Sequence, residues 1–347
     1  LFSTATEIST AFLPVFAQDA GGPDWLNAEM IASLPLIAYL LAMVLVSPFR
    51  GAISRRFGPR TLFLSCVPLT ALTLIGVGVA HSAAMIAIWH GAMALIYALA
   101  TVACQDYALE AANRRESARA MGSYSFVILG GVFCGAALGG VLADRIGFQM
   151  TFFFAAALAV CSGVLGYFAL NSRVRTDAAE PPAAAGIEPA RTGNILSNRR
   201  LLALLACVSA PKNIAMSVFV WYITPLALAA EGASFADIGR VVMIYDLVPL
   251  FVMPLFARLA DTRVGYTPFL IAGLGVSGLA LGSLVFWNGF WAVMVAVTGL
   301  GLGHAMIDTT HYVQAKRIAR DSGLRNADLS AMGALRLIER ASAIVGL

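Results

Sequence analysis

Long apolar runs separated by short polar loops extend over the whole chain. Each run is about 20 residues long, the length at which an α-helix crosses the hydrocarbon core of a bilayer. The pattern therefore predicts about eleven membrane-spanning helices. These spans are predicted at residues 1–17, 29–49, 61–80, 84–106, 122–140, 149–170, 201–226, 239–257, 268–287 and 290–311, and after residue 328.

One of these spans, 122–140, is rich in glycine along one side. Its glycines are Gly122, Gly130, Gly131, Gly135, Gly139 and Gly140. Three of them recur every fourth residue, which places them on one helix face. In water each glycine inside a helix costs about 1 kcal/mol, whereas in a bilayer small residues at this spacing let two helices approach closely. The span is therefore expected to pack tightly against a neighbouring helix.

The composition agrees with an integral membrane protein. The chain is 59% hydrophobic and 12% charged, against about 25% charged in ordinary soluble domains. The apolar runs are too long for the alternating segments of about 10 residues that build a transmembrane barrel. The net charge of +4 comes from basic residues dispersed among loops, so no nucleic-acid partner is expected. The five cysteines lie in apolar runs without ligand spacing, and neither a metal nor a cofactor is expected.

The distribution of lysine and arginine predicts the orientation in the membrane. Residues 171–199 are charged and contain Pro181-Pro182, an alanine run and Gly186, which is typical of a linker between two halves, 1–170 and 200–347. Cytoplasmic loops carry an excess of Lys and Arg, so the linker and the N-terminus are expected on the cytoplasmic side. The Arg-rich loops are 50–60, 110–119, 171–200, 258–267 and 312–328.

The two halves repeat each other. Arg56-Phe57-Gly58 follows the second span, and Arg263-Val264-Gly265 follows the eighth. Ala120-Met121-Gly122 opens the fifth span, and Ala331-Met332-Gly333 opens the last one. The offsets between the copies are nearly equal, so one six-span unit is expected twice.

The glycine span resembles the antiporter motif on the fifth helix of the major facilitator superfamily. The match is carried by Gly122, Gly131, Gly135-Ala136 and Gly139-Gly140, and Ala136 stands where the family usually has proline. The resemblance implies an all-α membrane fold of two six-helix bundles related by pseudo-two-fold symmetry. On that pattern twelve spans are expected, with the start of the first, the end of the eleventh and the whole twelfth outside this sequence.

The loop after the second span resembles the loop signature of the same superfamily. Gly51, Arg56, Gly58 and Arg60 match the signature, and Arg55 stands where the family has an aspartate. The resemblance implies a gating role, with a latch weakened or rewired by Arg55. Anchoring of the loop by its positive charge alone is the alternative.

The equivalent loop of the second half keeps an acid, shifted by one position. It contains Asp261, Arg263 and Gly265. The same two interpretations, gating and positive-inside anchoring, apply to it.

Ionisable residues inside spans are costly and mark functional sites by default. Glu7 and Lys212 are the leading pair, because spans one and seven line the central cavity in the fold that the resemblance implies. An acid and a base there could neutralise each other until a proton or a charged substrate separates them. The further candidates for the proton and substrate cavity are His90, Asn213, Asp246, His304 and Asp308.

Other polar groups have simpler interpretations. Arg336, Glu339 and Arg340 stand at i, i+3 and i+4 and can satisfy one another locally. His90 can be a packed core histidine, and Asp106, at the cytoplasmic edge of the fourth span, can pair with loop arginines. Aromatic residues expected to frame the cavity are Phe12, Tyr97, Trp221 and Tyr222.

No enzyme motif is present: the sequence contains no Walker loop, no HExxH and no GxSxG. The resemblance implies a monomeric secondary transporter in a bacterial cytoplasmic membrane, with protons and a small organic or amphipathic solute as its partners. Proton-coupled efflux is the leading expectation. A proton symporter or a uniporter for an organic anion is one alternative, and a transport-like sensor or scaffold is another.

Overall fold

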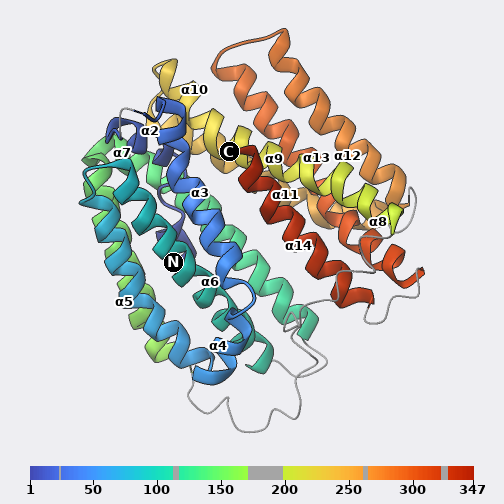
Figure 1. The fold of residues 1–347 in the computed structure, drawn as a ribbon, viewed down its shortest axis with the longest axis horizontal. Helices are drawn as coiled ribbons and strands as arrows, with labels where there is room; N and C mark the ends of the chain where they lie inside the picture. Colours follow the sequence, from blue (N-terminus) through green and yellow to red (C-terminus); the bar gives the residue numbers. More distant parts are fainter. Residues whose placement is uncertain (23–24, 112–116, 171–197, 261–264, 322–326) are drawn as a thin grey trace. The chain divides into compact units, whose positions relative to one another are not determined.

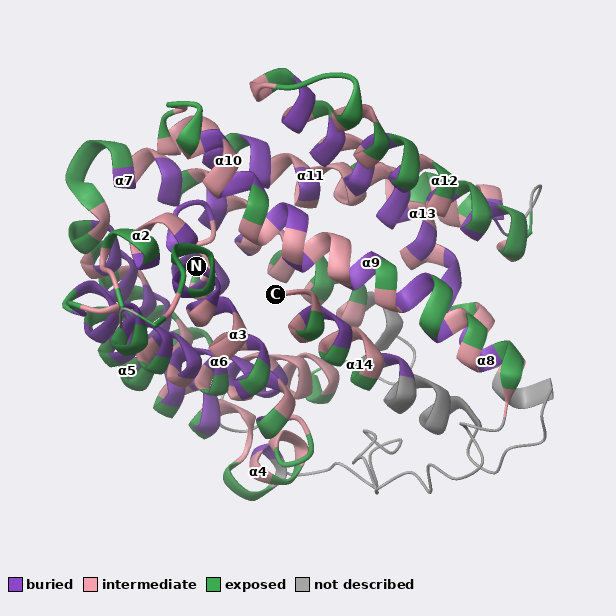
Figure 2. Ribbon diagram, turned by 45° about the horizontal axis from the view of Figure 1, so that its top comes forward, coloured by how far each residue is buried: buried purple, intermediate pink, exposed green. Residues whose placement is uncertain are grey.

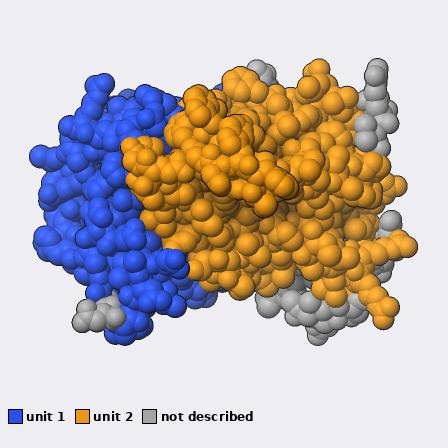
Figure 3. Space-filling view, turned by 90° about the horizontal axis from the view of Figure 1, so that it is seen from above, with its two compact units in different colours: residues 1–186, 234–240 blue, residues 187–233, 241–347 orange. Residues whose placement is uncertain are grey.

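The computed structural model describes residues 1–22, 25–111, 117–170, 198–260, 265–321 and 327–347 (Figure 1). The described residues form helices and no strands, as the apolar pattern predicts. Contacts divide the chain into two compact units (Figure 3). Unit 1 comprises residues 1–186 and 234–240, and unit 2 comprises residues 187–233 and 241–347. The predicted functional halves, 1–170 and 200–347, stay a prediction, and most of the predicted linker lies outside the described residues.

Unit 1 contains most of the first six predicted spans. The fifth and sixth predicted spans form two helices that share the label α7 and are separated at Gly147, whose backbone is not helical (φ 79°, ψ 167°). Its helices are α1 (Phe2–Thr6), α2 (Leu13–Asp19), α3 (Ala28–Val46), α4 (Arg50–Phe57), α5 (Pro59–Gly78), α6 (Ala83–Ala111) and α7 (Ser117–Ala169).

The first predicted span is broken. Residues 7–12 form turns between α1 and α2, with bonds from Thr10 N to the Glu7 carbonyl (3.2 Å) and from Phe12 N to the Ser9 carbonyl (3.0 Å). Pro14 explains the break, because proline has no N–H and its ring clashes with the carbonyl four residues earlier. It stands in the first turn of α2, the place where a helix accepts proline.

Unit 2 contains a seventh span that alternates between α-helix and the wider π-helix. Each π segment, η3 and η4, ends just before a short α-helix whose first turn holds a proline, Pro211 or Pro225. The segments of this span are α8 (Arg199–Leu204), η3 (Leu205–Ser209), α9 (Ala210–Ile214), η4 (Ala215–Ile223) and α10 (Thr224–Ala230).

The remaining helices of the second half are longer and more regular. Residues 235–240 of the first of them, α11, belong to unit 1, and its later turns belong to unit 2. They are α11 (Phe235–Leu259), α12 (Tyr266–Gly282), η6 (Ser283–Val285), α13 (Phe290–Asp321) and α14 (Ala327–Gly346).

Eight helical segments in the described part of the chain are long and apolar enough to cross a membrane. One of them covers two predicted spans, and neither the broken first span nor α14 is among the eight. The predicted number of spans therefore stays a prediction. Both α5 and α12 expose residues along their length (Figure 2), among them Leu72 (55% exposed), Ile271 (62%) and Leu279 (77%). Apolar side chains exposed in this way suit contact with lipid.

The close packing expected of the glycine face is confirmed, and its partner is the broken first span. A Cβ atom at Gly131 would lie 2.7 Å from Ser3 Cβ, and one at Gly135 would lie 3.0 Å from Glu7 Cβ. At Gly139 it would lie 1.6 Å from the Ile8 carbonyl oxygen. Because this oxygen belongs to the backbone, no side chain can be accommodated at position 139.

A second face of α7 holds the first turn of α11. A Cβ at Gly140 would lie 2.1 Å from the Phe235 carbonyl oxygen, and one at Gly239 would lie 2.6 Å from the Ala136 carbonyl oxygen. The Asp144 carboxylate accepts hydrogen bonds from the amides of Phe235 (2.8 Å) and Ala236 (2.7 Å). It thereby satisfies two amides that have no partner inside the new helix.

The predicted repeat is supported by two glycines. Gly58 between α4 and α5 has φ 76° and ψ 149°, and Gly265 before α12 has φ 81° and ψ 162°. This backbone region is essentially restricted to glycine. The glycine of the loop signature therefore has the same structural role in both halves: it starts the following helix in a new direction.

The substitution Gly139→Ala tests the contact between α7 and the first span. It should lower the free energy of unfolding by about 3 kcal/mol or prevent folding, because a methyl group there overlaps a backbone oxygen. The control is Gly122→Ala in the same helix, where nothing lies within 4 Å of the added carbon. Thermal unfolding and monodispersity in detergent measure both variants, and equal stability of the two would contradict this packing.

Candidate functional site

Glu7 lies at the break of the first span, directly after α1. Its side chain is half-buried. The Thr10 hydroxyl donates to Glu7 Oε2 (3.2 Å) and to the Glu7 carbonyl oxygen (2.8 Å). The Tyr39 hydroxyl, from α3, is a second hydrogen-bond partner of the carboxylate. The break thus places an acid beside two hydroxyl groups, those of Thr10 and Tyr39.

The glycine face of α7 fixes the position of Glu7. A Cβ at Gly135 would meet the Thr4 carbonyl oxygen at 2.9 Å and the backbone and Cβ of Glu7 at 3.0 Å. A larger residue at position 135 would therefore push the acid away from its partners. In this way the antiporter-like motif and the candidate proton carrier form one structural unit.

His90 is close to the same site. It lies in α6, is 5% exposed, and its ring lies 5.4 Å from the Tyr39 ring between centroids. Its Nδ1 atom is buried without a hydrogen-bond partner among the described residues. Unit 1 therefore brings two predicted site residues, Glu7 and His90, into contact with the same tyrosine.

Lys212 forms an ion pair with Asp308 inside unit 2. Lys212 lies in α9, between the two π-helical segments, and its side chain is 9% exposed; that of Asp308, in α13, is 27% exposed. The predicted pair of Glu7 and Lys212 joins residues of different units, each described by itself, so it stays a prediction. Within its own unit, the cation of Lys212 is paired with Asp308.

The ion pair continues into a longer polar chain. His311 Nδ1 lies 3.6 Å from Asp308 Oδ1, and His311 Nε2 lies 3.2 Å from Glu339 Oε1. The Tyr312 hydroxyl donates to the same glutamate oxygen (3.2 Å). Helices α9, α13 and α14 are therefore connected by charged side chains in the interior of unit 2.

The three remaining residues predicted for the cavity, His304, Asn213 and Asp246, also lie within helices, where they are buried or half-buried. His304 is 2% exposed, and its Nδ1 lies 2.7 Å from the Tyr245 hydroxyl. The Asn213 amide donates to the Ser209 carbonyl oxygen of the same helical span (2.8 Å). Asp246 is half-buried in α11.

Sequence reasoning missed His311. Glu339 was interpreted as part of a local cluster with Arg336 and Arg340; its carboxylate lies beside His311 in α13, and because the side chain of Arg336 is not among those described, the local cluster stays a prediction. A signal for His311 was present, because His304, Asp308 and His311 stand at i, i+4 and i+7 and share one helix face. Only the first two were recognised, since the span was expected to end at residue 311.

The first loop signature attaches α4 and α5 to their neighbours in unit 1. Ser54, in α4, donates to Asp106 Oδ2 in α6 (2.5 Å). Arg60 donates to the Tyr167 carbonyl oxygen (3.2 Å), and its guanidinium lies 5.3 Å from the Tyr167 ring centroid. These contacts attach the loop to α6 and to the end of α7, on the side that the sequence predicts to be cytoplasmic.

The remaining signature residues are described in part. Gly51 lies in α4, and the Arg56 guanidinium lies 5.9 Å from the Phe57 ring centroid. The side chain of Arg55 is not among those described, and Asp261 and Arg263 lie outside the described residues. The predicted gating role of both loops stays a prediction.

Two of the four aromatic residues expected to frame the cavity, Phe12 and Tyr97, are buried. Phe12 is fully buried, with its ring centroid 5.1 Å from that of Phe148. Tyr97 is 7% exposed, with its ring 6.4 Å from that of Phe2. These two residues belong to the core of unit 1.

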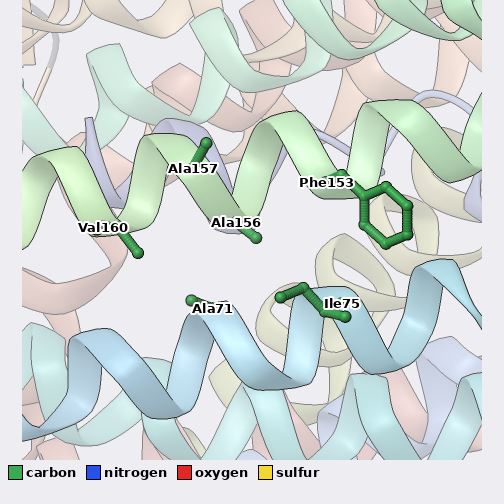
Figure 4. A pocket seen from close by; sticks show the side chains of 6 residues that line it. All are labelled: Ala71, Ile75, Phe153, Ala156, Ala157 and Val160. Atoms are coloured by element: carbon green, nitrogen blue, oxygen red, sulfur yellow. The ribbon is translucent and has the colours of Figure 1, made fainter.

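An apolar pocket of about 330 Å³ lies between α5 and α7 (Figure 4). Its lining contains no polar side chain, so it offers nothing to orient a polar solute. Its residues are Ala71, Ile75, Phe153, Ala156, Ala157 and Val160. No group of three or more His, Cys, Asp and Glu suited to a metal occurs in the part of the chain that the structure describes.

The chain is similar to known membrane transporters. The family model of the Major Facilitator Superfamily matches residues 1–347. The multidrug resistance protein MdtG of Proteus mirabilis is 24% identical over 285 residues, which cover 81% of this chain and 69% of the relative. MdtG of Yersinia enterocolitica is 24% identical over 294 residues, covering 82% of this chain and 68% of that protein.

Solved transporter structures share the fold. A bacterial homologue of the human lysosomal transporter Spinster, in an inward-facing and occupied conformation, has a TM-score of 0.72 at 14% identity, over 99% of this chain and 76% of that one. The unoccupied form has a TM-score of 0.68 at 16% identity, over 100% and 78%. At this level of identity the likeness concerns the fold alone.

The ion pair of Lys212 and Asp308 can be tested by removing one or both charges. Lys212→Met should lower the free energy of unfolding by about 3 kcal/mol, because it leaves a carboxylate in a mostly buried site without its strongest partner. The double variant Lys212→Met/Asp308→Asn should recover at least half of that loss. Thermal unfolding in detergent measures the cycle, and additive losses in the double variant would show that the two residues do not interact.

Proposed function

The chain belongs to the Major Facilitator Superfamily, and we propose that it exports small organic molecules in exchange for protons, with Glu7 as the proton carrier. Membership makes it a multi-pass membrane transporter of small molecules. The direction, the coupling ion and the role of Glu7 are the proposal. In this fold two bundles of helices give alternating access to a site near the middle of the membrane.

The observation that carries the proposal is the position of Glu7 between α1 and α2. Interrupted helices at membrane depth are typical of the sites where transporters bind ions and substrates. An ionisable residue there is costly unless it has a function or a partner. Glu7 has both a helix break and hydroxyl partners, which is the setting expected of a carrier.

The partners of Glu7 suit a group that changes its protonation state. The hydroxyls of Thr10 and Tyr39 can donate hydrogen bonds to an ionised carboxylate. The same hydroxyls can accept a hydrogen bond from a protonated one. Glu7 therefore has hydrogen-bond partners suited to both states, which supports its role as a proton carrier.

Export is favoured over the alternatives by two observations. The relatives named multidrug resistance protein MdtG match over most of this chain, and the glycine motif resembles that of antiporters. Lys212 is the cation expected to attract an organic anion, but it is paired with Asp308. Anion symport, uniport and a sensor without transport remain as outcomes of the experiment below.

The variant Glu7→Gln should lose proton-driven efflux and keep exchange of substrate for substrate. Glutamine can keep the hydrogen bonds, but its amide does not take up or release a proton. Efflux driven by a pH gradient should therefore fall to roughly a tenth of the wild-type rate or less. The assay uses proteoliposomes and a panel of cationic, neutral and anionic organic compounds, and it records solute and proton movement together.

The matched control is Asp19→Asn, which removes an exposed acid at the end of the same first span. It should transport at the wild-type rate. Gradient-driven efflux that survives in Glu7→Gln would exclude Glu7 as the carrier. Solute movement without proton movement in the wild type would identify a uniporter, and no movement of any compound by folded protein would favour the sensor.

A further inference from the structure

His311 is enclosed by oxygen atoms. Its side chain is fully buried. The Nδ1 atom lies 3.1 Å from the Ile307 carbonyl oxygen and 3.6 Å from Asp308 Oδ1, and the Nε2 atom lies 3.2 Å from Glu339 Oε1. Both ring nitrogens therefore face hydrogen-bond acceptors.

A neutral imidazole cannot satisfy this arrangement beside an ionised glutamate. It has one N–H donor and one nitrogen lone pair. With the hydrogen on Nε2, the lone pair of Nδ1 faces the Ile307 carbonyl oxygen. With the hydrogen on Nδ1, the lone pair of Nε2 faces the Glu339 carboxylate. In either tautomer a nitrogen lone pair of the buried ring therefore faces another hydrogen-bond acceptor.

One additional proton removes the conflict. It can reside on His311, which then donates from both nitrogens, or on Glu339, which then donates to Nε2. We infer that His311 and Glu339 together hold one exchangeable proton, in a site separate from Glu7. The Tyr312 hydroxyl can donate to Glu339 Oε1 in both cases, because in the second the single hydrogen of the acid is directed at Nε2.

The charges around the pair support the same conclusion. With the proton present, Lys212 balances Asp308, and the His311–Glu339 pair is neutral as a whole. Without it, the four side chains of Lys212, Asp308, His311 and Glu339, which are between 0% and 27% exposed, together carry one negative charge. Uncompensated charge in such surroundings is strongly unfavourable.

Apolar residues pack along the same helices. Leu201, Leu205, Ala315 and Leu335 form one buried cluster of unit 2, and Val208, Leu270 and Ile307 form another. Among the described residues, the titratable groups in contact with the pair are Asp308 and Tyr312. Lys212 on α9 pairs with Asp308, Arg340 follows Glu339 on α14, and His304 on α13 contacts Tyr245 on α11.

The proton holds helices together. His311 lies in α13 and Glu339 in α14, and Asp308 extends the contact to Lys212 in α9. Loss of the proton would leave the Nε2 lone pair facing Glu339 between α13 and α14 in one tautomer, and the Nδ1 lone pair facing the Ile307 carbonyl oxygen within α13 in the other. In both cases the buried contact carries a net negative charge, so we expect α14 to pack less closely when the proton is lost. Only the use of this proton in transport rests on the proposed function; its binding does not.

Spectroscopy of the whole protein in lipid nanodiscs tests the inference. Nitrogen-15 resonances of the four histidines report whether each ring is neutral or doubly protonated, and infrared spectra report whether Glu339 is a carboxylic acid. At neutral pH we expect either a doubly protonated His311 or an infrared band of a protonated acid that Glu339→Gln removes. A neutral His311 beside an ionised Glu339 overturns the inference.

Single variants assign the nitrogen resonances to His311 and provide the control. His311→Gln identifies the resonance; if it does not fold, the substitutions His81→Gln, His90→Gln and His304→Gln identify it by elimination. In Glu339→Gln the amide supplies its own donor to Nε2, so His311 should be neutral. The exposed His81 is the control, and His81→Gln should leave the His311 signal unchanged. Because no substrate is involved, failure here is distinct from failure of Glu7→Gln in transport.

Hydrogen exchange tests the effect on α14. Raising the pH until the spectra show loss of the proton should increase exchange in α14 of the wild type, after correction for the intrinsic dependence of exchange on pH. In Glu339→Gln the same pH step should leave α14 unchanged. Equal exchange before and after proton loss in the wild type would overturn the control of packing by the proton.

Discussion

The structure depends on one constraint: polar groups inside a bilayer must find their partners within the protein. The break in the first span leaves backbone and carboxylate groups that Thr10 and Tyr39 satisfy. In unit 2, Lys212 is satisfied by Asp308. The same constraint makes a missing proton at His311 costly, because both nitrogens of its buried ring face hydrogen-bond acceptors. Function is then expected at buried polar groups, such as Glu7, whose hydrogen-bond partners can satisfy two different protonation states.

The constraint also explains which features the sequence could predict. The apolar runs gave the helices of both units, and the spacing of Gly131, Gly135 and Gly139 gave the existence of a tight contact, because both follow from local periodicity. The identity of the partner did not follow, since nothing in the sequence states which span faces the glycines. Pro14 was a signal for the break near Glu7, because its missing N–H weakens a helix through the preceding turn; it was not decisive, since α3 and α5 continue through Pro35 and Pro68.

Pairings between distant spans were beyond the sequence for a different reason. Lys212 was expected opposite Glu7 by analogy between spans one and seven; that pair stays a prediction, and the partner found within unit 2 is Asp308 on α13. The long side chain of a lysine in a span can reach several acids, and only the geometry selects among them. For Glu339 the nearest arginines in the sequence were the simplest partners, and its contact with His311 on the neighbouring helix could not be inferred from local spacing.

One departure from the family's motif, Ala136 in place of proline, has a physical meaning in this structure. The carbonyl oxygen of Ala136 lies where a side chain at Gly239 would stand, and Gly140 meets the backbone of Phe235. Proline at position 136 would remove a backbone donor and bend α7. With alanine the helix continues without that bend, and one face contacts Glu7 while another contacts the first turn of α11. A displacement of α7 is therefore transmitted to both contacts at once, because neither has a side chain that could absorb it.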